Sequence, residues 1–423
     1  MNEFTSYAMA KKYLLTILNN TAMNNSSSIL TSSLKQKNGI ISKFHINTSP
    51  EFNPIVAQPY NIDKVTLEQV DNLKINYIFT TGRSASTLLG VMLMMHEQVV
   101  FTSEEVFPII LRQKYRSIKS WTTKTIQQYC DDFVLMSEGK LYPLFAGKEV
   151  LKQLLLKFQN QLNYERVIRL SYLAFGINKD VSKITHIVDK QLRYYLSRYY
   201  LQLFPNAKIL LLVRDPRDNV YSKFNYNQRL RTHYNSCLYI YTWEEAFQTY
   251  FSILQKSKIP FLIVNYEKLI SESTDTLKNI SNFLDLPYTS KFFDYPSIIQ
   301  DLFENIQDPK LKDYFFITHK SLTQPISPQK VNEWKHNINQ PEIAHLINAT
   351  WTMTQELAKQ LNYQSHNDFK PIHLSCWKTQ LKVKFNHISS FIYFHFVPYF
   401  IKRLIKVKKY PYRLQSPSTY DDF

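Results

Sequence analysis

Short runs of apolar residues alternate with segments of helical periodicity along the middle of this chain. The runs are rich in aliphatic and β-branched side chains, which predicts strands buried on both faces of a sheet. We expect strands at Ile75–Thr80, Ile184–Val188, Lys208–Val213 and Phe261–Val264. We expect helices at Ser86–Met95, Lys148–Leu162, Leu192–Leu203, Tyr241–Gln255 and Thr274–Leu284. Strands alternating with helices predict an α/β fold with a central parallel β-sheet flanked by helices.

The two ends of the chain lack this alternation. Residues 19–33 contain eleven Asn, Ser or Thr in fifteen positions, a composition that cannot bury a core. We therefore divide the chain into a partly flexible N-terminal tail (1–71), a folded domain (72–365) and a basic, aromatic C-terminal extension (366–423).

The C-terminal extension is open to two interpretations. Phe385–Ile401 is aromatic and apolar, with basic residues on both sides and a proline near its end. Such a stretch suits peripheral association with a membrane interface through residues 378–413, and it equally suits an ordinary packed helix. No run is long enough to predict a membrane span.

Charge and cysteine content limit the functional classes. The formal net charge of +17 favours an anionic partner, but much of the excess lies in the C-terminal extension. No nucleic-acid-binding motif is present, so we expect no nucleic acid partner. Cys130, Cys237 and Cys376 are odd in number and far apart, which indicates neither a disulfide framework nor a zinc site. With no signal peptide pattern, these features favour a cytoplasmic protein without a metal.

The stretch Tyr77–Gly90, YIFTTGRSASTLLG, predicts an anion-binding turn between a strand and a helix. Such a turn presents unpaired backbone N–H groups. Gly82 is expected to permit the turn, and Arg83 adds a guanidinium that suits an oxyanion. The lysine of a nucleotide-binding P-loop is absent, which argues against a kinase-like Mg-nucleotide site.

A second stretch, Phe204–Phe224, carries another candidate anion site. The strand delivers Arg214 at its carboxyl end, and Ser222 follows two turns into the next helix. The alternative is that Arg214 forms a structural ion pair with an acid such as Asp218. For Arg217 we favour such a structural pair.

Together the two stretches resemble the PAPS-dependent sulfotransferases, most of all the protein-tyrosine sulfotransferase branch and its bacterial relatives. GRSASTLL resembles the family's 5′-phosphosulfate loop and LLLVRDPRDNVYS its 3′-phosphate segment. IVDKQ, LFPN, VNYEKL and the tryptophan of VNEWK follow in the family's order. The resemblance implies a P-loop-like sulfotransferase fold over roughly residues 72–363, with PAPS as the sulfuryl donor, PAP as the product and no metal.

The resemblance also implies roles for individual residues. Arg83, Ser84, Ala85, Ser86 and Thr87 would hold the 5′-phosphate, and Arg214 and Ser222 the 3′-phosphate. Ala85 replaces the family's usual glycine, which we expect to be tolerated only if its φ stays negative. Tyr266 is expected either to line the cofactor or to be a core tyrosine.

Three residues are candidates for catalysis beside Arg83. Lys190 would stabilise the charge that develops on the leaving phosphate. Glu104 or Glu105 would take the proton of the acceptor hydroxyl. One way of aligning the segment favours Glu104 and another favours Glu105, and a solvated acidic turn is the alternative for both.

The acceptor is left open as a carbohydrate, lipid, small molecule or protein tyrosine. The competing functional classes are a kinase-like P-loop enzyme and a basic nucleic-acid-binding protein.

Overall fold

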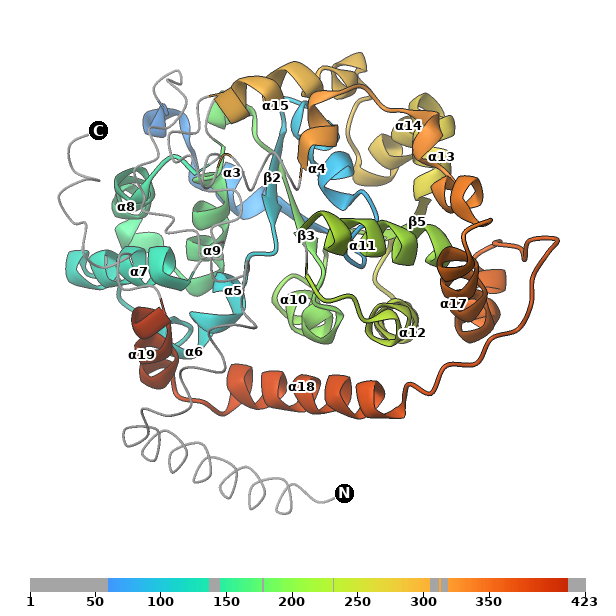
Figure 1. The fold of residues 1–423 in the computed structure, drawn as a ribbon. Coiled ribbons are helices and arrows are strands. Elements are labelled where there is room, and N and C mark those ends of the chain that lie inside the picture. The colour runs from blue at the N-terminus through green and yellow to red at the C-terminus, as the bar shows by residue number, and fades with distance from the viewer. Residues whose placement is uncertain are drawn as a thin grey trace.

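The computed structural model describes residues 60–136, 145–176, 179–230, 232–304, 312 and 319–409. Its centre is a five-stranded parallel sheet in the order β2-β3-β1-β4-β5 (Figure 1). The strands are β1 (Lys74–Phe79), β2 (Val99–Ser103), β3 (His186–Gln191), β4 (Ile209–Val213) and β5 (Phe261–Asn265). The predicted α/β fold with a central parallel sheet is confirmed. β2 is a fifth strand that the apolar pattern did not predict.

Helices cover both faces of the sheet. Alternate side chains of each inner strand point to opposite faces, so Ile78 and Leu210 join one apolar cluster while Phe79 and Leu211 join the other. The first face is covered by α4 (Ser86–Met94), α13 (Tyr266–Ser271), α14 (Ser273–Leu284) and α15 (Tyr295–Glu304). The second is covered by α5 (Phe107–Ile110), α7 (Thr123–Met136), α9 (Tyr164–Leu173), α10 (Ser197–Leu203) and α12 (Ser236–Ser257). This three-layer arrangement explains why the strands are apolar without alternation.

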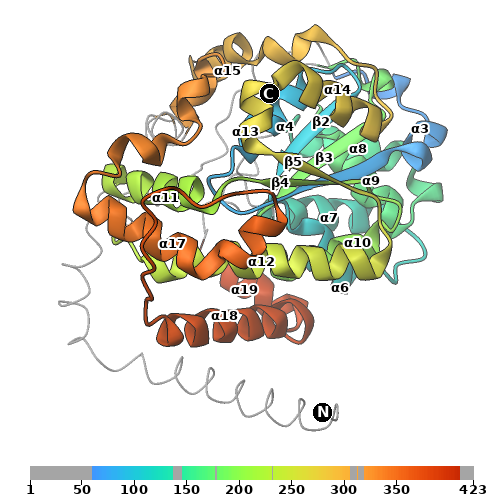
Figure 2. The same cartoon turned by 90° about the vertical axis from the view of Figure 1, so that its right-hand side faces the viewer.

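The remaining helices extend these layers. They are α3 (Leu67–Asn72), α6 (Arg112–Tyr115), α8 (Lys148–Lys157), α11 (Pro216–Leu230), α17 (Pro341–Gln360), α18 (Trp377–His395) and α19 (Tyr399–Lys409). α11 follows β4 and packs with α17 around Trp334, forming a third apolar cluster. The two views show α18 along the lower side of the molecule, beneath α12, and α19 packs against α7 (Figures 1 and 2).

The C-terminal extension begins with a covalent link to the domain. Cys376 and Cys237 form a disulfide that ties the residue before α18 to α12. The expectation that the cysteines form no disulfide was wrong, because residues 139 positions apart in sequence are brought together by the fold. Cys130 is free and buried. The N-terminal segment predicted to be flexible, 19–33, lies outside the described residues.

No helix among the described residues is long and apolar enough to cross a membrane. The apolar stretch Phe385–Ile401 is divided between α18 and α19, which meet at Pro398. A proline has no N–H to continue a helix, which gives the physical reason for the break.

Candidate active site at the carboxyl edge of the sheet

The predicted phosphate loop connects β1 to α4 at the carboxyl edge of the sheet. α4 begins at Ser86, and no side chain caps its N-terminus. A helix that starts this way presents backbone N–H groups and the positive end of its dipole to the space beyond the loop. The arrangement is that of a strand, a loop and a helix able to hold an oxyanion.

The backbone of the loop is left-handed at two residues that are not glycine. Arg83 has φ of 68° and Ala85 has φ of 62°, whereas Gly82 is not left-handed. The expectation that Gly82 permits the turn was therefore wrong, and so was the condition of a negative φ at Ala85. A left-handed alanine costs about 1–2 kcal/mol, because its Cβ crowds the backbone. The loop holds this strain because the surrounding structure fixes it.

The side chain of Asn219 in α11 holds the loop in place through hydrogen bonds. Its Nδ2 donates to the carbonyl of Gly82 at 3.0 Å, to Ser84 Oγ at 2.9 Å and to Thr81 Oγ1 at 3.3 Å. Thr81 and Ser84 also share a hydrogen bond of 3.3 Å. Sequence reasoning missed Asn219, although it lies within the RDPRDN motif. Ser84 is thus turned towards the protein interior.

A buried ion pair lies beside the loop. Lys190 Nζ, at the carboxyl end of β3, is 3.4 Å from Glu104 Oε1 and 3.2 Å from Thr87 Oγ1. Lys190 and Glu104 are each only 6% exposed. The structure therefore brings together a carboxylate, an ammonium and a hydroxyl of the loop helix from three separate sequence segments.

The Glu104–Glu105 turn is fixed through its backbone. Glu104 has φ of 62°, and its N–H donates to the carbonyl of Lys190 at 2.6 Å. Its own carbonyl accepts from Arg193 at 3.1 Å. The Glu105 carbonyl accepts from Tyr200 at 2.8 Å and from Gln191 at 3.1 Å. The alternative of a solvated acidic turn was wrong, because neither glutamate faces bulk water.

The buried carboxylate of Asp189 also stabilises this turn. Its carboxylate accepts from Tyr172 at 3.0 Å and from Gln191 at 2.7 Å, and it also interacts with the backbone of Glu105. Burial raises the pKa of the Asp189 carboxyl to about 7. Because successive residues of a strand point to opposite faces, Asp189 enters the core while Lys190 meets Glu104.

Arg214 forms a second polar centre, on the far side of the loop from Lys190 in the strand order. Its Nη1 donates to the carbonyl of Arg83 at 3.0 Å and its Nη2 to that of Lys330 at 3.3 Å. The guanidinium lies 4.2 Å from the centre of the Tyr266 ring and 3.6 Å from the Asp218 carboxylate. The ion pair with Asp218 that was the alternative for Arg214 is therefore present. Its buried Nε meets no hydrogen-bond acceptor among the described residues, which leaves one donor for an anion.

Tyr266 lies at Arg214, and Ser222 and Arg217 lie on the helix that follows it. Tyr266 is buried under the guanidinium, and its hydroxyl donates to the carbonyl of Lys330 at 3.3 Å. Ser222 lies one helical turn beyond Asp218 on α11 and is partly exposed. Arg217 forms the expected structural pair, 2.6 Å from Asp215, and stacks between the rings of Trp334 and Trp351.

Lys223 is a cation that sequence reasoning missed. It follows Ser222 on α11 and is 6% exposed, and its Nζ meets no hydrogen-bond acceptor among the described residues. Burial, followed by the charge of Arg83, lowers the pKa of Lys223 to about 7. Arg83 itself lies 4.9 Å from the centre of the Tyr226 ring, on the same helix. The Lys223 Nζ lies 5.3 Å from the centre of the Tyr239 ring.

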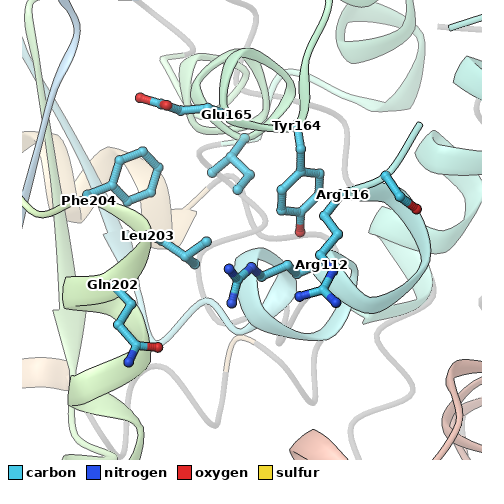
Figure 3. A pocket seen from close by; sticks show the side chains of 9 residues that line it. Arg112, Arg116, Tyr164, Glu165, Gln202, Leu203 and Phe204 are labelled. Carbon is cyan, nitrogen blue, oxygen red and sulfur yellow. The ribbon is translucent and has the colours of Figure 1, made fainter. Parts of the chain in front are cut away.

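A pocket of ≈ 450 Å³ lies elsewhere, between α6, α9 and α10. Figure 3 shows the guanidinium groups of Arg112 and Arg116 beside the ring of Tyr164 at its wall. No predicted site residue lines this pocket. Among the described residues, no three His, Cys, Asp or Glu side chains are placed to hold a metal ion.

The fold and the site define a class: an α/β protein with an oxyanion-binding loop after its central strand and a buried carboxylate–ammonium pair beside that loop. The sulfotransferase family model matches residues 77–290, half of the chain, so this protein belongs to the sulfotransferase family. The match includes the loop, the Glu104–Lys190 pair and the Arg214 centre.

Individual relatives are distant. Protein-tyrosine sulfotransferase 1 of Danio rerio is 24% identical over 229 residues, which is 52% of this chain and 56% of that protein. The chain thus aligns with little more than half of that relative's length. Among solved structures, the sulfotransferase domain from the curacin biosynthetic pathway is 19% identical with a TM-score of 0.42, covering 70% of this chain and 99% of that one. The sulfotransferase domain from the Synechococcus PCC 7002 olefin synthase is 21% identical with a TM-score of 0.42, covering 70% and 97%.

Proposed function

We propose that this sulfotransferase moves the sulfuryl group of PAPS to an acceptor hydroxyl and releases PAP. The observation that carries the proposal is the position of Lys190 Nζ, 3.2 Å from the hydroxyl of Thr87 and 3.4 Å from the carboxylate of Glu104. A cation beside the phosphate loop and a carboxylate beside that cation are the two groups that sulfuryl transfer requires: one for the leaving phosphate and one for the attacking hydroxyl.

The site suits an anionic donor with two phosphate positions. The loop, Arg83 and Thr87 would meet the 5′-phosphosulfate, and Arg214, Ser222 and Tyr266 the 3′-phosphate. The buried donors of Arg214 and Lys223 that meet no acceptor among the described residues support this fit, because a bound anion would satisfy both. Ser86 and Ala85 would contribute their backbone N–H groups rather than their side chains.

Within this proposal, Glu104 is the base rather than Glu105. The carboxylate of Glu104 forms the ion pair with Lys190. Glu105 is fully buried, and its backbone carbonyl accepts hydrogen bonds from Gln191 and Tyr200. Glu104 would accept the proton of the acceptor hydroxyl while Lys190 stabilises the oxygen of the departing phosphate. Both groups are already held in place, so little reorganisation would accompany the reaction.

The division of the chain and its location follow as parts of the proposal. Residues 72–365 would form the sulfotransferase domain, and 366–423 an extension that is tied to it. The disulfide of that extension favours an oxidising compartment over the cytosol that the sequence suggested. The acceptor stays open between a carbohydrate, a lipid, a small molecule and a protein tyrosine.

A thermal-shift comparison of PAP, AMP and ATP with Mg²⁺ tests the donor. A ligand at about 100 times its dissociation constant should add roughly 2.7 kcal/mol to the free energy of unfolding. We expect PAP to stabilise the protein most, and Arg214→Gln to remove the difference between PAP and AMP. Stabilisation by ATP with Mg²⁺ but not by PAP would overturn the proposal and restore the kinase-like alternative.

A further inference from the structure

The exposed faces of α18 and α19 carry an unusual concentration of apolar side chains. Nine of the thirteen large apolar side chains that are exposed among the described residues lie between Trp377 and Ile405. They are Trp377, Leu381, Phe385, Ile388, Phe391, Phe396, Phe400, Leu404 and Ile405. Exposure runs from 45% at Phe396 to 62% at Leu404. We call these nine residues the apolar face.

The apolar face follows helical geometry. Trp377, Leu381, Phe385 and Ile388 are spaced by four, four and three residues, so they share one side of α18. Phe400 and Leu404 repeat the spacing on α19. α18 runs along the lower side of the molecule, beneath α12, and α19 packs against α7 (Figures 1 and 2). Exposed apolar side chains concentrated on neighbouring helices indicate an interaction site.

The opposite sides of the two helices are firmly attached to the domain. On α18, Val383 is buried, and His387 Nε2 hydrogen-bonds the hydroxyl of Tyr194 at 2.8 Å. On α19, Lys402 is buried with its Nζ 3.2 Å from Gln113 Oε1, and Arg403 is 3.2 Å from Asp132 Oδ1. Because these contacts fix which side of each helix meets the domain, the outward direction of the apolar face is set by the fold.

The charged side chains of α18 and α19 themselves are all positive. Between Trp377 and Lys409 the chain has eight Lys or Arg and no Asp or Glu. Lys378, Lys382 and Lys384 are exposed on α18 itself. Exposed apolar side chains among cations are the pattern of a helix that lies in the interface of an anionic bilayer.

Charge also distinguishes between an anionic membrane, a second copy of the chain and the chain's own N-terminal residues as the occupant of this face. A second copy would oppose one cationic surface to another, which electrostatic repulsion disfavours. The chain's own residues 1–59 contain five Lys and two Glu, so their net charge is positive as well. Only an anionic surface complements the charge. With no spanning helix among the described residues, the geometry is that of helices lying on a membrane rather than crossing it.

We propose that the apolar face of α18 and α19 docks this protein on the surface of a membrane that contains anionic lipids. Trp377 and the phenylalanines enter the headgroup boundary, and Lys378, Lys382 and Lys384 contact the headgroups. The disulfide at Cys376 and the contacts of α19 keep the two helices fixed, so docking would hold the domain at a defined orientation. The proposal does not depend on the identity of the sulfuryl donor.

The test is cosedimentation of the full chain with phosphatidylcholine vesicles, with and without phosphatidylserine. We expect binding only when phosphatidylserine is present, weakened about tenfold by Lys382→Glu because each cation near the surface contributes to binding. Leu381→Glu should abolish binding. The matched controls are Ile298→Glu, an apolar residue 44% exposed on α15, and Lys278→Glu on α14, and both should bind as the unchanged protein does.

Tryptophan fluorescence provides an independent readout. Trp377 is 56% exposed, whereas Trp121, Trp243, Trp334 and Trp351 are at most 2% exposed. A blue shift on adding anionic vesicles should therefore come from Trp377, and Trp377→Phe should remove it. If acrylamide fails to quench Trp377 before any vesicle is added, another part of the protein covers the apolar face. That result would overturn the proposal. If the protein does not bind vesicles but forms dimers, and Leu381→Glu dissociates those dimers, the apolar face binds a second copy of the chain and the membrane proposal is wrong.

Discussion

At the carboxyl edge of the sheet charged side chains are buried, whereas along α18 and α19 apolar side chains are exposed. Lys190, Glu104 and Lys223 are each 6% exposed, while Leu381 and Phe400 are about ten times more exposed, at 59% and 62%. Both arrangements are unfavourable for the isolated chain, since burying a charge and exposing a large apolar group each cost free energy. The difference lies in what offsets that cost. Lys190 and Glu104 offset each other's charge, whereas Lys223 would be offset by an anion and the apolar side chains of the helices by a membrane.

Removing the proposed base has the largest expected effect on the buried side of this comparison. Glu104→Gln should reduce the rate of PAP formation from PAPS by about 10²–10⁴-fold, because a positioned base contributes that much to proton transfer. Because Glu104→Gln also leaves the buried Lys190 ammonium without its carboxylate, it should lower the melting temperature as well, so the rates are compared at a temperature where both proteins are folded. Glu105→Gln is the matched variant, and a loss of activity confined to that variant would exchange the roles of the two glutamates.

Breaking the buried ion pair should cost stability. Lys190→Met leaves the buried Glu104 carboxylate without its cation. This should lower the free energy of unfolding by about 3–5 kcal/mol. Lys278→Met is the control, because Lys278 pairs with Asp275 at 3.5 Å on the surface and should lose at most about 1 kcal/mol. Chemical denaturation measures both, and equal losses would show that the Lys190 pair is solvated.

The pH dependence of anion binding should identify Lys223. Its pKa is lowered to about 7, so the amine is protonated below that pH and neutral above it. Since a bound anion favours the protonated amine, affinity for PAP should be constant below pH 7 and fall as pH rises through it, by at most about tenfold per unit. Calorimetric titration of PAP measures this. Lys223→Met should remove the dependence, and a profile unchanged by that substitution would place Lys223 away from the bound anion.

The strain in the phosphate loop is open to a smaller test. Ala85→Gly should raise the free energy of unfolding by about 1 kcal/mol, because glycine accepts a φ of 62° without a Cβ clash. Ala344→Gly, in the right-handed α17, should lower it by a similar amount. The same sign in both variants would mean that the left-handed backbone at Ala85 carries no strain.

The smallest effect is expected on the exposed side of the comparison. Leu381→Ala should change the free energy of unfolding by no more than about 0.5 kcal/mol, since its side chain is mostly in solvent. Leu211→Ala, in the fully buried β4, should cost about 2–5 kcal/mol. A large loss at Leu381 would reveal that the apolar face is packed within the protein.

The sequence alone determined the class of fold and the segments that form the site. Apolar runs such as Lys208–Val213 are long enough to be strands and too short for core helices, and the loop motif Tyr77–Gly90 is local, so both could be interpreted without tertiary contacts. The strand order was not predicted, because it depends on packing between elements far apart in sequence. The strand β2 was not predicted, because its five residues are followed directly by Glu104 and Glu105, which are typical of a turn.

Only the tertiary structure decided which groups meet. Glu104 differs from its neighbour in its ion pair with Lys190, and Lys223 stands out by its burial. The disulfide between Cys237 and Cys376, and the side of α18 that faces outward, were set by the same long-range packing. Hydrophobic periodicity reports which residues can be buried, but burial, pairing and pKa depend on neighbours that the chain brings together only when it folds.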